Sequence, residues 1–196
     1  MLPPAAPGLR IGLFGGSFNP CHAGHLMLAK TALKRLKLHQ VWWLVSPGNP
    51  LKDHTGLASE ATRIAQCEAL IGRDARMKVS GIEGKIGTHY SAQTLRYILR
   101  HRPSCRFVWL MGADNLAGFH RWKDWQGIAR TIPIAIIDRP GSTLRAASGR
   151  AARRFSRAFI DESDAGLLTG FKPPALVFLH GRRVPLSSTA LRAQVN

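Results

Sequence analysis

Residues 15–25, GGSFNPCHAGH, decide the fold of this chain. The preceding residues 9–14, LRIGLF, form a short apolar run that is typical of a buried parallel strand. Residues 26–36 then carry apolar side chains at roughly helical spacing. The stretch therefore predicts a strand, a glycine turn and a helix start. We expect Gly15 and Gly16 to adopt backbone angles that a side chain would forbid and to let a ligand approach the main chain.

The predicted helix start favours an anion. Free amides at a helix N-terminus attract negative charge, and here they would lie at the carboxyl end of the strand. His22 and His25 are three residues apart, so both imidazoles would lie on one side of the first turn if the helix begins near His22. Short motifs also match by chance, and HAGH alone fits a glycine turn with two solvent-facing histidines equally well.

HAGH resembles the HxGH signature of the nucleotidyltransferase superfamily, and GGSFNPCHAGHL is similar to the first motif of bacterial nicotinate-nucleotide adenylyltransferases. The resemblance implies an ATP-binding loop made of Gly15, Gly16, Ser17, Phe18, His22 and His25. Gly16 and Ser17 are also implied to contact nicotinate mononucleotide. One position departs from the family, because Asn19 stands where Asp is usual. Asn keeps a polar side chain that can bond the loop backbone, but it removes a negative charge.

The composition limits the class of protein. With 196 residues, 45% of them hydrophobic, the chain is long enough for one α/β domain with a sizeable core, and we expect residues 1–196 to form a single domain. Lys and Arg number 28 against 11 Asp and Glu, and the formal charge of +17 implies anionic partners, either a nucleotide or a nucleic-acid backbone. Many arginines lie in residues 139–157, and such a run is more often a solvated face than a site.

The cysteines and the N-terminus indicate the compartment. Three cysteines without a CxxC pair argue against a disulfide framework and a zinc site, so a reducing environment fits best. The start, MLPPAAPGLR, lacks a basic region followed by an apolar core, and no later run approaches membrane-spanning length. We therefore expect a cytoplasmic protein with no membrane partner.

A second strand is predicted over residues 40–46, QVWWLVS, and it ends at the turn-forming PGNP of residues 47–50. Strand, helix and strand make a βαβ unit, whose ligands collect where the strands end in loops. Lys52 follows this turn. In the family a basic residue of this loop contacts the triphosphate, so the resemblance implies that Lys52 is catalytic and contacts both substrates; the alternative is a surface lysine.

The next elements prepare a second part of the site. Residues 59–71 predict a helix capped by Ser59, with Ile64, Ala65, Leu70 and Ile71 on its apolar side. Alternation over residues 77–86 predicts a strand. A further helix is predicted over residues 91–102.

Thr88, His89 and Tyr90 come directly before that last helix and resemble the family's SYTxxTL segment, whose loop amides hold the pyridine carboxylate. The resemblance therefore implies that all three bind nicotinate mononucleotide. Because His89 occupies the family's Ser or Thr position, the implication rests on the backbone more than on the side chain. Without the resemblance, Tyr90 is as well explained as a core anchor.

The most apolar strand is predicted over residues 106–111, RFVWLM, and Gly112 and Asp114 follow it. This order places a carboxylate at the carboxyl end of the sheet, where it can accept from ribose hydroxyls. In the family a GxD motif here contacts the adenosine part of ATP, which implies Gly112 and Asp114, and a later Trp stacks on the pyridine ring. We favour Trp122 for that stacking and Trp125 for the core, although either would suit a core position.

The C-terminal third adds two motifs. Residues 132–137 predict a buried strand, a helix is predicted over 144–159, and a last strand over 175–180. The strand over 132–137 ends in DRPG, similar to the family's RPG turn, which puts Arg139 near the nucleotide. Residues 185–196 read PLSSTALRAQVN, and their hydroxyls stand at a predicted helix start. Taken alone this is ordinary capping; paired with HAGH it resembles the SSTxIR motif and implies that ATP is bound by Ser187, Ser188, Thr189 and Arg192.

Alternating strands and helices predict one Rossmann-like, doubly wound parallel α/β sheet with helices on both faces. The family implies adenylyl transfer from ATP to nicotinate mononucleotide, giving deamido-NAD and pyrophosphate in NAD biosynthesis. It implies catalytic roles for His22, His25, Lys52 and Arg192, with Mg²⁺ accompanying ATP and no metal site of the protein's own. The mononucleotide phosphate is already an ionised nucleophile, so positioning and charge stabilisation suffice.

Two alternatives stay open. The first is another adenylyltransferase: the phosphopantetheine enzyme commonly has Thr at the position of His22, which argues against it, whereas an enzyme for nicotinamide mononucleotide is harder to exclude. The second is a basic nucleic-acid-binding module. Such a module would interleave exposed aromatic side chains with its basic residues, and the single aromatic residue within 139–157 is Phe155. We expect ATP and nicotinate mononucleotide as partners and no specific nucleic acid.

Overall fold

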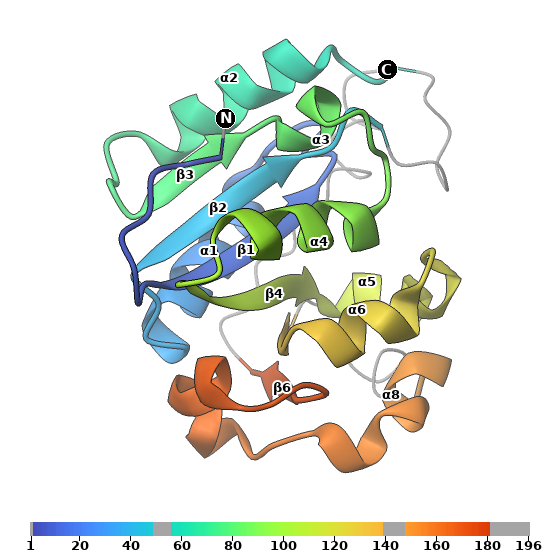
Figure 1. Cartoon of the computed structure of the whole chain (residues 1–196). Coiled ribbons are helices and arrows are strands. Elements are labelled where there is room, and N and C mark those ends of the chain that lie inside the picture. The colour runs from blue at the N-terminus through green and yellow to red at the C-terminus, as the bar shows by residue number, and fades with distance from the viewer. Residues whose placement is uncertain (1, 49–55, 139–147, 181–196) are drawn as a thin grey trace.

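A single parallel sheet organises the computed structural model, which describes residues 2–48, 56–138 and 148–180. Its six strands lie in the order β3-β2-β1-β4-β5-β6, and every neighbouring pair is parallel (Figure 1). The strands are Arg10–Gly16 (β1), Gln40–Val45 (β2), Met77–Ser80 (β3), Arg106–Gly112 (β4), Ile134–Ile137 (β5) and Leu176–Leu179 (β6). The predicted doubly wound sheet is confirmed, with its change of direction between β1 and β4.

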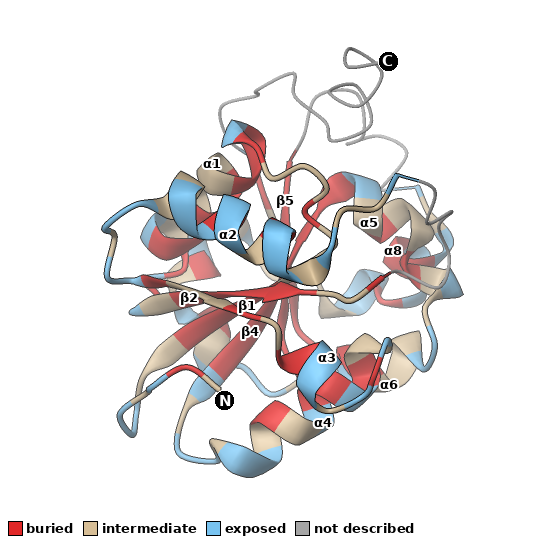
Figure 2. Ribbon diagram, turned by 90° about the horizontal axis from the view of Figure 1, so that it is seen from above, coloured by how far each residue is buried: buried red, intermediate tan, exposed pale blue. Residues whose placement is uncertain are grey.

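Helices cover both faces of the sheet. The α-helices are Ala23–Arg35 (α1), Glu60–Ile71 (α2), Ile82–Lys85 (α3), Ser91–His101 (α4), Ala113–Gly118 (α5), Trp125–Thr131 (α6) and Arg150–Arg154 (α8). The 3₁₀ segments are Phe119–Arg121 (η1), Ser156–Ala158 (η2) and Glu162–Gly170 (η3). Figure 2 shows α1 and α2 on one side of the buried strands and α3, α4 and α6 on the other. Within the described ranges, none of the helices has the length and apolarity needed to cross a membrane.

Alternate residues of the central strands feed two separate cores. In β1, Ile11 and Leu13 face the cluster that contains residues of α4, α5 and α6, whereas Phe14 faces the cluster built on α1. In β2, Trp42 and Trp43 divide between the two clusters in the same way. Since both faces are covered, the strands appear in the sequence as continuous apolar runs.

Four sequence expectations need correction. The strand expected over 77–86 ends at Ser80, and α3 follows it. The expected alternation runs through Gly81 and Gly84, where any Cβ would overlap the Glu60 carboxylate of α2. The helix expected over 144–159 is only α8 followed by η2 within the described residues.

The third correction concerns α2, which begins after Ser59 as expected. The Ser59 hydroxyl accepts the Thr62 amide hydrogen at 3.1 Å. Ile64, Leu70 and Ile71 pack against the cluster built on α1 as expected, but Ala65 is exposed, and Arg63 and Cys67 are the buried residues of this helix.

The two glycines that end β1 are explained by close packing and not by their backbone angles. The positive-φ glycines of the described chain are Gly8, Gly56, Gly72 and Gly87, so the expected special angles at Gly15 and Gly16 are not found. A Cβ on Gly15 would lie 2.7 Å from Cη2 of Trp109, a rigid buried ring in the neighbouring strand β4. Glycine therefore lets β1 and its following loop lie close to β4.

Gly15→Ala should lower the free energy of unfolding by about 1–3 kcal/mol, because the ring or the strand must shift to admit a methyl group. Chemical denaturation would measure this. Gly170→Ala is the control: nothing lies within 4 Å of the added Cβ, and its effect should stay within about 0.5 kcal/mol. Equal effects of the two substitutions would contradict the packing explanation.

Candidate active site

Two histidines cap the helix that follows β1. His22 is the N-cap residue of α1, and its Nδ1 accepts the amide hydrogen of Gly24 at 3.1 Å. Nδ1 of His25 accepts the amide hydrogen of His22 at 3.3 Å. Together they form a capping box in which imidazoles replace the usual hydroxyl and carboxylate. Their ring centroids are 3.9 Å apart, which confirms that both rings lie on one side of the first turn.

The hydrogen bonds of the pair fix its tautomer. Because each Nδ1 accepts an amide hydrogen, each neutral ring carries its own hydrogen on Nε2, an assignment that follows from the bonding pattern. Both rings are largely buried, with 5% of His22 and 9% of His25 exposed. The first turn of α1 contains no acidic residue. The positive end of this helix is therefore accompanied by two neutral N–H donors, an arrangement suited to an anion.

The β1–α1 loop, residues 17–22, is held in an unusual shape. Phe18 has φ 49°, a left-handed conformation that is unfavourable for a bulky residue. Its ring is 2% exposed and packs edge-on against Phe14, with centroids 5.2 Å apart, and against His25 at 5.1 Å. Trp43 of β2 lies at the same centroid distance of 5.2 Å. Strain of this kind persists where the surroundings determine it, and it is frequent in functional loops.

Asn19 ties this loop to the chain that precedes α2. Its Nδ2 donates to the carbonyl of Gly56 at 3.1 Å, and its Oδ1 accepts from the amide of Ala58 at 3.4 Å. An ionised Asp could accept but not donate. The departure from the family's Asp thus supplies a donor that this contact uses.

Arg63 of α2 reaches the same region, and the sequence did not predict a functional role for it. Its side chain is 0% exposed and donates four hydrogen bonds to backbone carbonyls, those of Ser17, Ser46, Pro47 and Ala58. Burial lowers the pKa of the guanidinium, against which the nearby Glu60 acts. The available signal was a charged residue within a stretch expected to pack as a helix.

The carboxyl end of β4 lies beside that of β1, because the two strands pair in parallel from Arg10 to Phe14. Gly112 is buried at the start of α5, and Asp114 is exposed in its first turn. The expected order of strand, glycine and carboxylate at this edge is therefore observed. The end of β5 adds a second carboxylate that the sequence did not single out, Asp138, which is 4% exposed.

The segment before α4 uses two of its three amides internally. Thr88 donates its amide hydrogen to the carbonyl of Glu83 at 3.0 Å, and Tyr90 donates to Oγ1 of Thr88 at 3.1 Å. The Thr88 hydroxyl in turn donates to the side chain of Gln93. Within the described part of the chain, the amides of His89, Ser91 and Ala92 are left for an incoming acceptor, whereas Gln93 donates its amide hydrogen to the carbonyl of Tyr90 at 2.9 Å.

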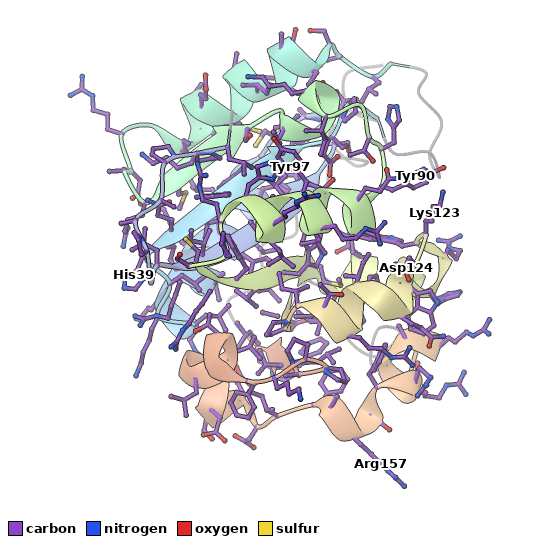
Figure 3. The ribbon with its side chains drawn as sticks, in the orientation of Figure 1. His39, Tyr90, Tyr97, Lys123, Asp124 and Arg157 are labelled. Carbon is purple, nitrogen blue, oxygen red and sulfur yellow. The ribbon has the colours of Figure 1, made fainter. Side chains whose placement is uncertain are left out.

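Lys123 brings the Trp122 segment to Tyr90. Its Nζ lies 4.3 Å from the centroid of the Tyr90 ring, and Figure 3 shows the two side chains together where α4 begins. Trp122 packs edge-on against Trp109 of β4, with centroids 6.2 Å apart. Trp125 lies between Phe119 and Phe155, and both tryptophans are half-buried against the same core cluster, so the choice of Trp122 for stacking stays a prediction. Lys123 was also missed, and its position beside Trp122 was the only sequence signal.

Some of the proposed site residues lie outside the described residues: Lys52, Arg139, Ser187, Ser188, Thr189 and Arg192. The structure thus brings together His22, His25 and the β1–α1 loop, places Gly112 and Asp114 at the neighbouring strand end, and joins Tyr90 to Lys123. Among residues 2–48, 56–138 and 148–180, no three His, Cys, Asp or Glu side chains are grouped so that they could hold a metal ion.

Comparison with known proteins gives concordant matches. A family model described as cytidylyltransferase-like matches residues 13–194. The chain is 57% identical over 182 residues to a probable nicotinate-nucleotide adenylyltransferase of Agrobacterium fabrum, a match that covers 93% of this chain and 97% of the relative. A protein of the same description from Rhizobium meliloti is 55% identical over 185 residues, and this match covers 94% of this chain and 98% of the relative.

A solved structure, Plasmodium falciparum nicotinic acid mononucleotide adenylyltransferase complexed with NaAD, is similar with a TM-score of 0.69. The match covers 94% of this chain and 83% of that chain at 17% identity, and at this identity it concerns the fold.

A buried acid supports the segment before α4 and makes stability depend on pH. Glu83 is 3% exposed, and its Oε1 accepts from Oγ1 of Thr94 at 3.0 Å. Burial raises the pKa of Glu83 from 4.5 to about 7, the Thr94 bond opposes the rise, and the charge of Glu60 adds to it. The folded protein therefore binds this proton more tightly than the unfolded chain does.

The contribution of Glu83 to stability should be fully present below pH 4.5 and should be lost as the pH rises to about 7. Glu83→Gln keeps the shape without the charge, so it should match the wild type at low pH and exceed it by about 3 kcal/mol at pH 8. Denaturant unfolding of both proteins across this range is the measurement. A difference that does not vary with pH would contradict the assignment.

Proposed function

The chain belongs to the cytidylyltransferase-like family, and within it to the nicotinate-nucleotide adenylyltransferases, and we propose that it carries out adenylyl transfer from ATP to nicotinate mononucleotide at the carboxyl edge of its sheet. The products are deamido-NAD and pyrophosphate. The observation that supports this function best is the pair His22 and His25, whose Nε2 hydrogens accompany the positive end of α1 at the carboxyl end of β1.

The reaction is a single displacement at phosphorus. A phosphate oxygen of the mononucleotide attacks the α-phosphorus of ATP and forms a new P–O bond. The bond from the α-phosphorus to the oxygen bridging to the β-phosphate breaks, and pyrophosphate leaves with the electron pair. The nucleophile is already ionised, so no side chain needs to remove a proton. Catalysis is then positioning of the two substrates and stabilisation of charge on the α-phosphate.

His22 and His25 would donate from Nε2 to the non-bridging α-phosphate oxygens, where negative charge grows in the transition state. Gly15, Gly16, Ser17 and Phe18 would let the triphosphate and mononucleotide approach the backbone. Gly112 and Asp114 would bind the adenosine part, with the carboxylate accepting from ribose hydroxyls.

For the β- and γ-phosphates we propose residues beyond the described ranges, on the strength of their motifs alone: Lys52, Arg139, Ser187, Ser188, Thr189 and Arg192. Mg²⁺ would arrive as the ATP complex, held by phosphate oxygens and water.

The pyridine ring would stack on Trp122, with its carboxylate near the start of α4. Since the amides of Thr88 and Tyr90 are bonded internally, the amide of His89 is the donor we propose from that segment. The charge of Lys123, which lies over the Tyr90 ring, would add attraction for an anionic carboxylate.

His25→Ala should lower kcat by about a hundredfold or more, because it removes a donor to the charge that develops on the α-phosphate. His39→Ala is a matched control, since Nδ1 of His39 also accepts a backbone amide, that of Arg10 at 2.9 Å. His39 lies just before β2, far from Tyr90 and Lys123 (Figure 3). Pyrophosphate release would be followed for both variants, with circular dichroism as the check of folding. A folded His25→Ala protein with near wild-type kcat would remove His25 from the mechanism.

Nicotinate mononucleotide should have a much higher kcat/KM than nicotinamide mononucleotide, because amides and an ammonium group donate to the carboxylate but oppose the NH₂ of the amide. Two hydrogen bonds to a charged group correspond to a ratio of the two kcat/KM values of roughly a hundredfold or more. Trp122→Ala should weaken both substrates alike, whereas Lys123→Met should weaken the acid more than the amide. Equal kcat/KM for the two substrates of the wild type would refute the choice of the acid.

A further inference from the structure

We propose that Arg63 is a positioning residue of the adenylyl-transfer site, one that aims the backbone amides of Phe18 and Gly48 toward the substrate phosphates. The inference rests on the proposed function for the identity of the ligand. It concerns a side chain that is completely buried and therefore touches no substrate.

Arg63 connects three parts of the chain that are distant in sequence. One terminal nitrogen, Nη1, donates to the carbonyl of Ser17 at 2.7 Å and to that of Ser46 at 2.6 Å. Nη2 donates to Pro47 at 3.2 Å, and Nε donates to Ala58 at 2.8 Å. Ser17 follows β1, Ser46 and Pro47 follow β2, and Ala58 precedes α2. A single guanidinium thus holds the chain where it leaves β1, where it leaves β2 and where it enters α2.

The direction of these carbonyls fixes the direction of the next amides. In a trans peptide the C=O and the following N–H point in opposite directions. Since the Ser17 carbonyl points at Arg63, the Phe18 amide hydrogen points away from it, and the same holds for the Pro47 carbonyl and the amide of Gly48. Within the described residues neither of these two amides has an acceptor. Both donors lie in the segments that follow β1 and β2, at the carboxyl edge of the sheet.

The backbone at Phe18 needs such support. Its left-handed conformation is not one that a phenylalanine adopts on its own. The aromatic contacts of Phe18 hold its ring, and Arg63 holds the carbonyl of the preceding residue. The next residue, Asn19, is held by its hydrogen bonds to Gly56 and Ala58. The strained turn is therefore fixed on both sides.

The chemistry of the residue matches this task better than a purely structural one. Burying an ionised group among neutral carbonyls is costly, and an apolar side chain of similar volume usually serves a core as well or better. The fork of donors on a guanidinium reaches several fixed acceptors at once, which the single ammonium of lysine cannot do. Every hydrogen bond that Arg63 makes to the described chain ends on a backbone carbonyl of these segments.

The test compares Arg63→Met and Arg63→Lys with Leu168→Ala, a stability control. Leu168 is fully buried in η3, an element that packs against β6 and β4. At a temperature where circular dichroism shows each variant folded, we would measure ATP binding by calorimetry, kcat and KM for both substrates, and hydrogen–deuterium exchange of the peptide covering residues 14–22.

Both Arg63 variants should bind ATP at least about tenfold more weakly than the wild type and should have a lower kcat. This is the effect expected when one well-placed hydrogen bond to a charged group is lost. Exchange should rise in residues 14–22 but not within α4. Added guanidinium ion should restore part of kcat to Arg63→Met and none to Leu168→Ala. The control should keep wild-type ATP affinity and kcat despite its lower stability.

Wild-type ATP affinity, kcat and exchange in a folded Arg63→Lys or Arg63→Met protein would overturn the proposal. Equal losses in Leu168→Ala would also overturn it, because the effect would then be one of stability. If Arg63→Met does not fold, Arg63→Lys decides by the same criteria. A wild-type protein that releases no pyrophosphate from ATP and nicotinate mononucleotide would instead reject the proposed function, and the exchange result would still judge the role of Arg63 in the loop.

Discussion

Six parallel strands impose one constraint on the whole molecule: all their carboxyl ends meet at the same edge of the sheet. β1 lies at the centre with β2 on one side and β4 on the other, so the segments that follow these three strands converge there. The packing of Gly15 against Trp109 lets β1 and β4 approach closely at this edge. Arg63 and Asn19 then tie the segment after β1 to the residues that follow β2 and precede α2.

The electrostatics of the candidate site depend on how α1 is capped. A conventional capping box ends in a carboxylate, which would repel a phosphate from the same helix end. His22 and His25 satisfy the backbone with Nδ1 and keep an N–H on Nε2, so the cap itself can donate to an anion. The formal charge of +17 favours anionic ligands in general, but the local arrangement of the two imidazoles is what suits the candidate site to phosphate.

The sequence was sufficient for features that depend on local pattern. Continuous apolar runs predicted β1, β2 and β4, and HAGH predicted two imidazoles on one turn, because both follow from residue spacing alone. Periodicity failed where a tertiary contact decides: Gly81 and Gly84 pack on Glu60 and end the predicted strand. It also failed at Arg63, since a charge is buried only when distant carbonyls are brought to it. Lys123 and Glu83 were missed for the same reason, as their partners become neighbours only through the fold.

The central claim is that the two histidines stabilise charge during one direct displacement and do not themselves become adenylylated. The stereochemistry at the α-phosphorus tests this most directly, with a single diastereomer of ATP carrying sulfur at the α-position and nicotinate mononucleotide as acceptor. One in-line displacement predicts inversion of configuration in the deamido-NAD analogue. Retention would mean two displacements through a covalent adenylyl-enzyme, and it would contradict the account.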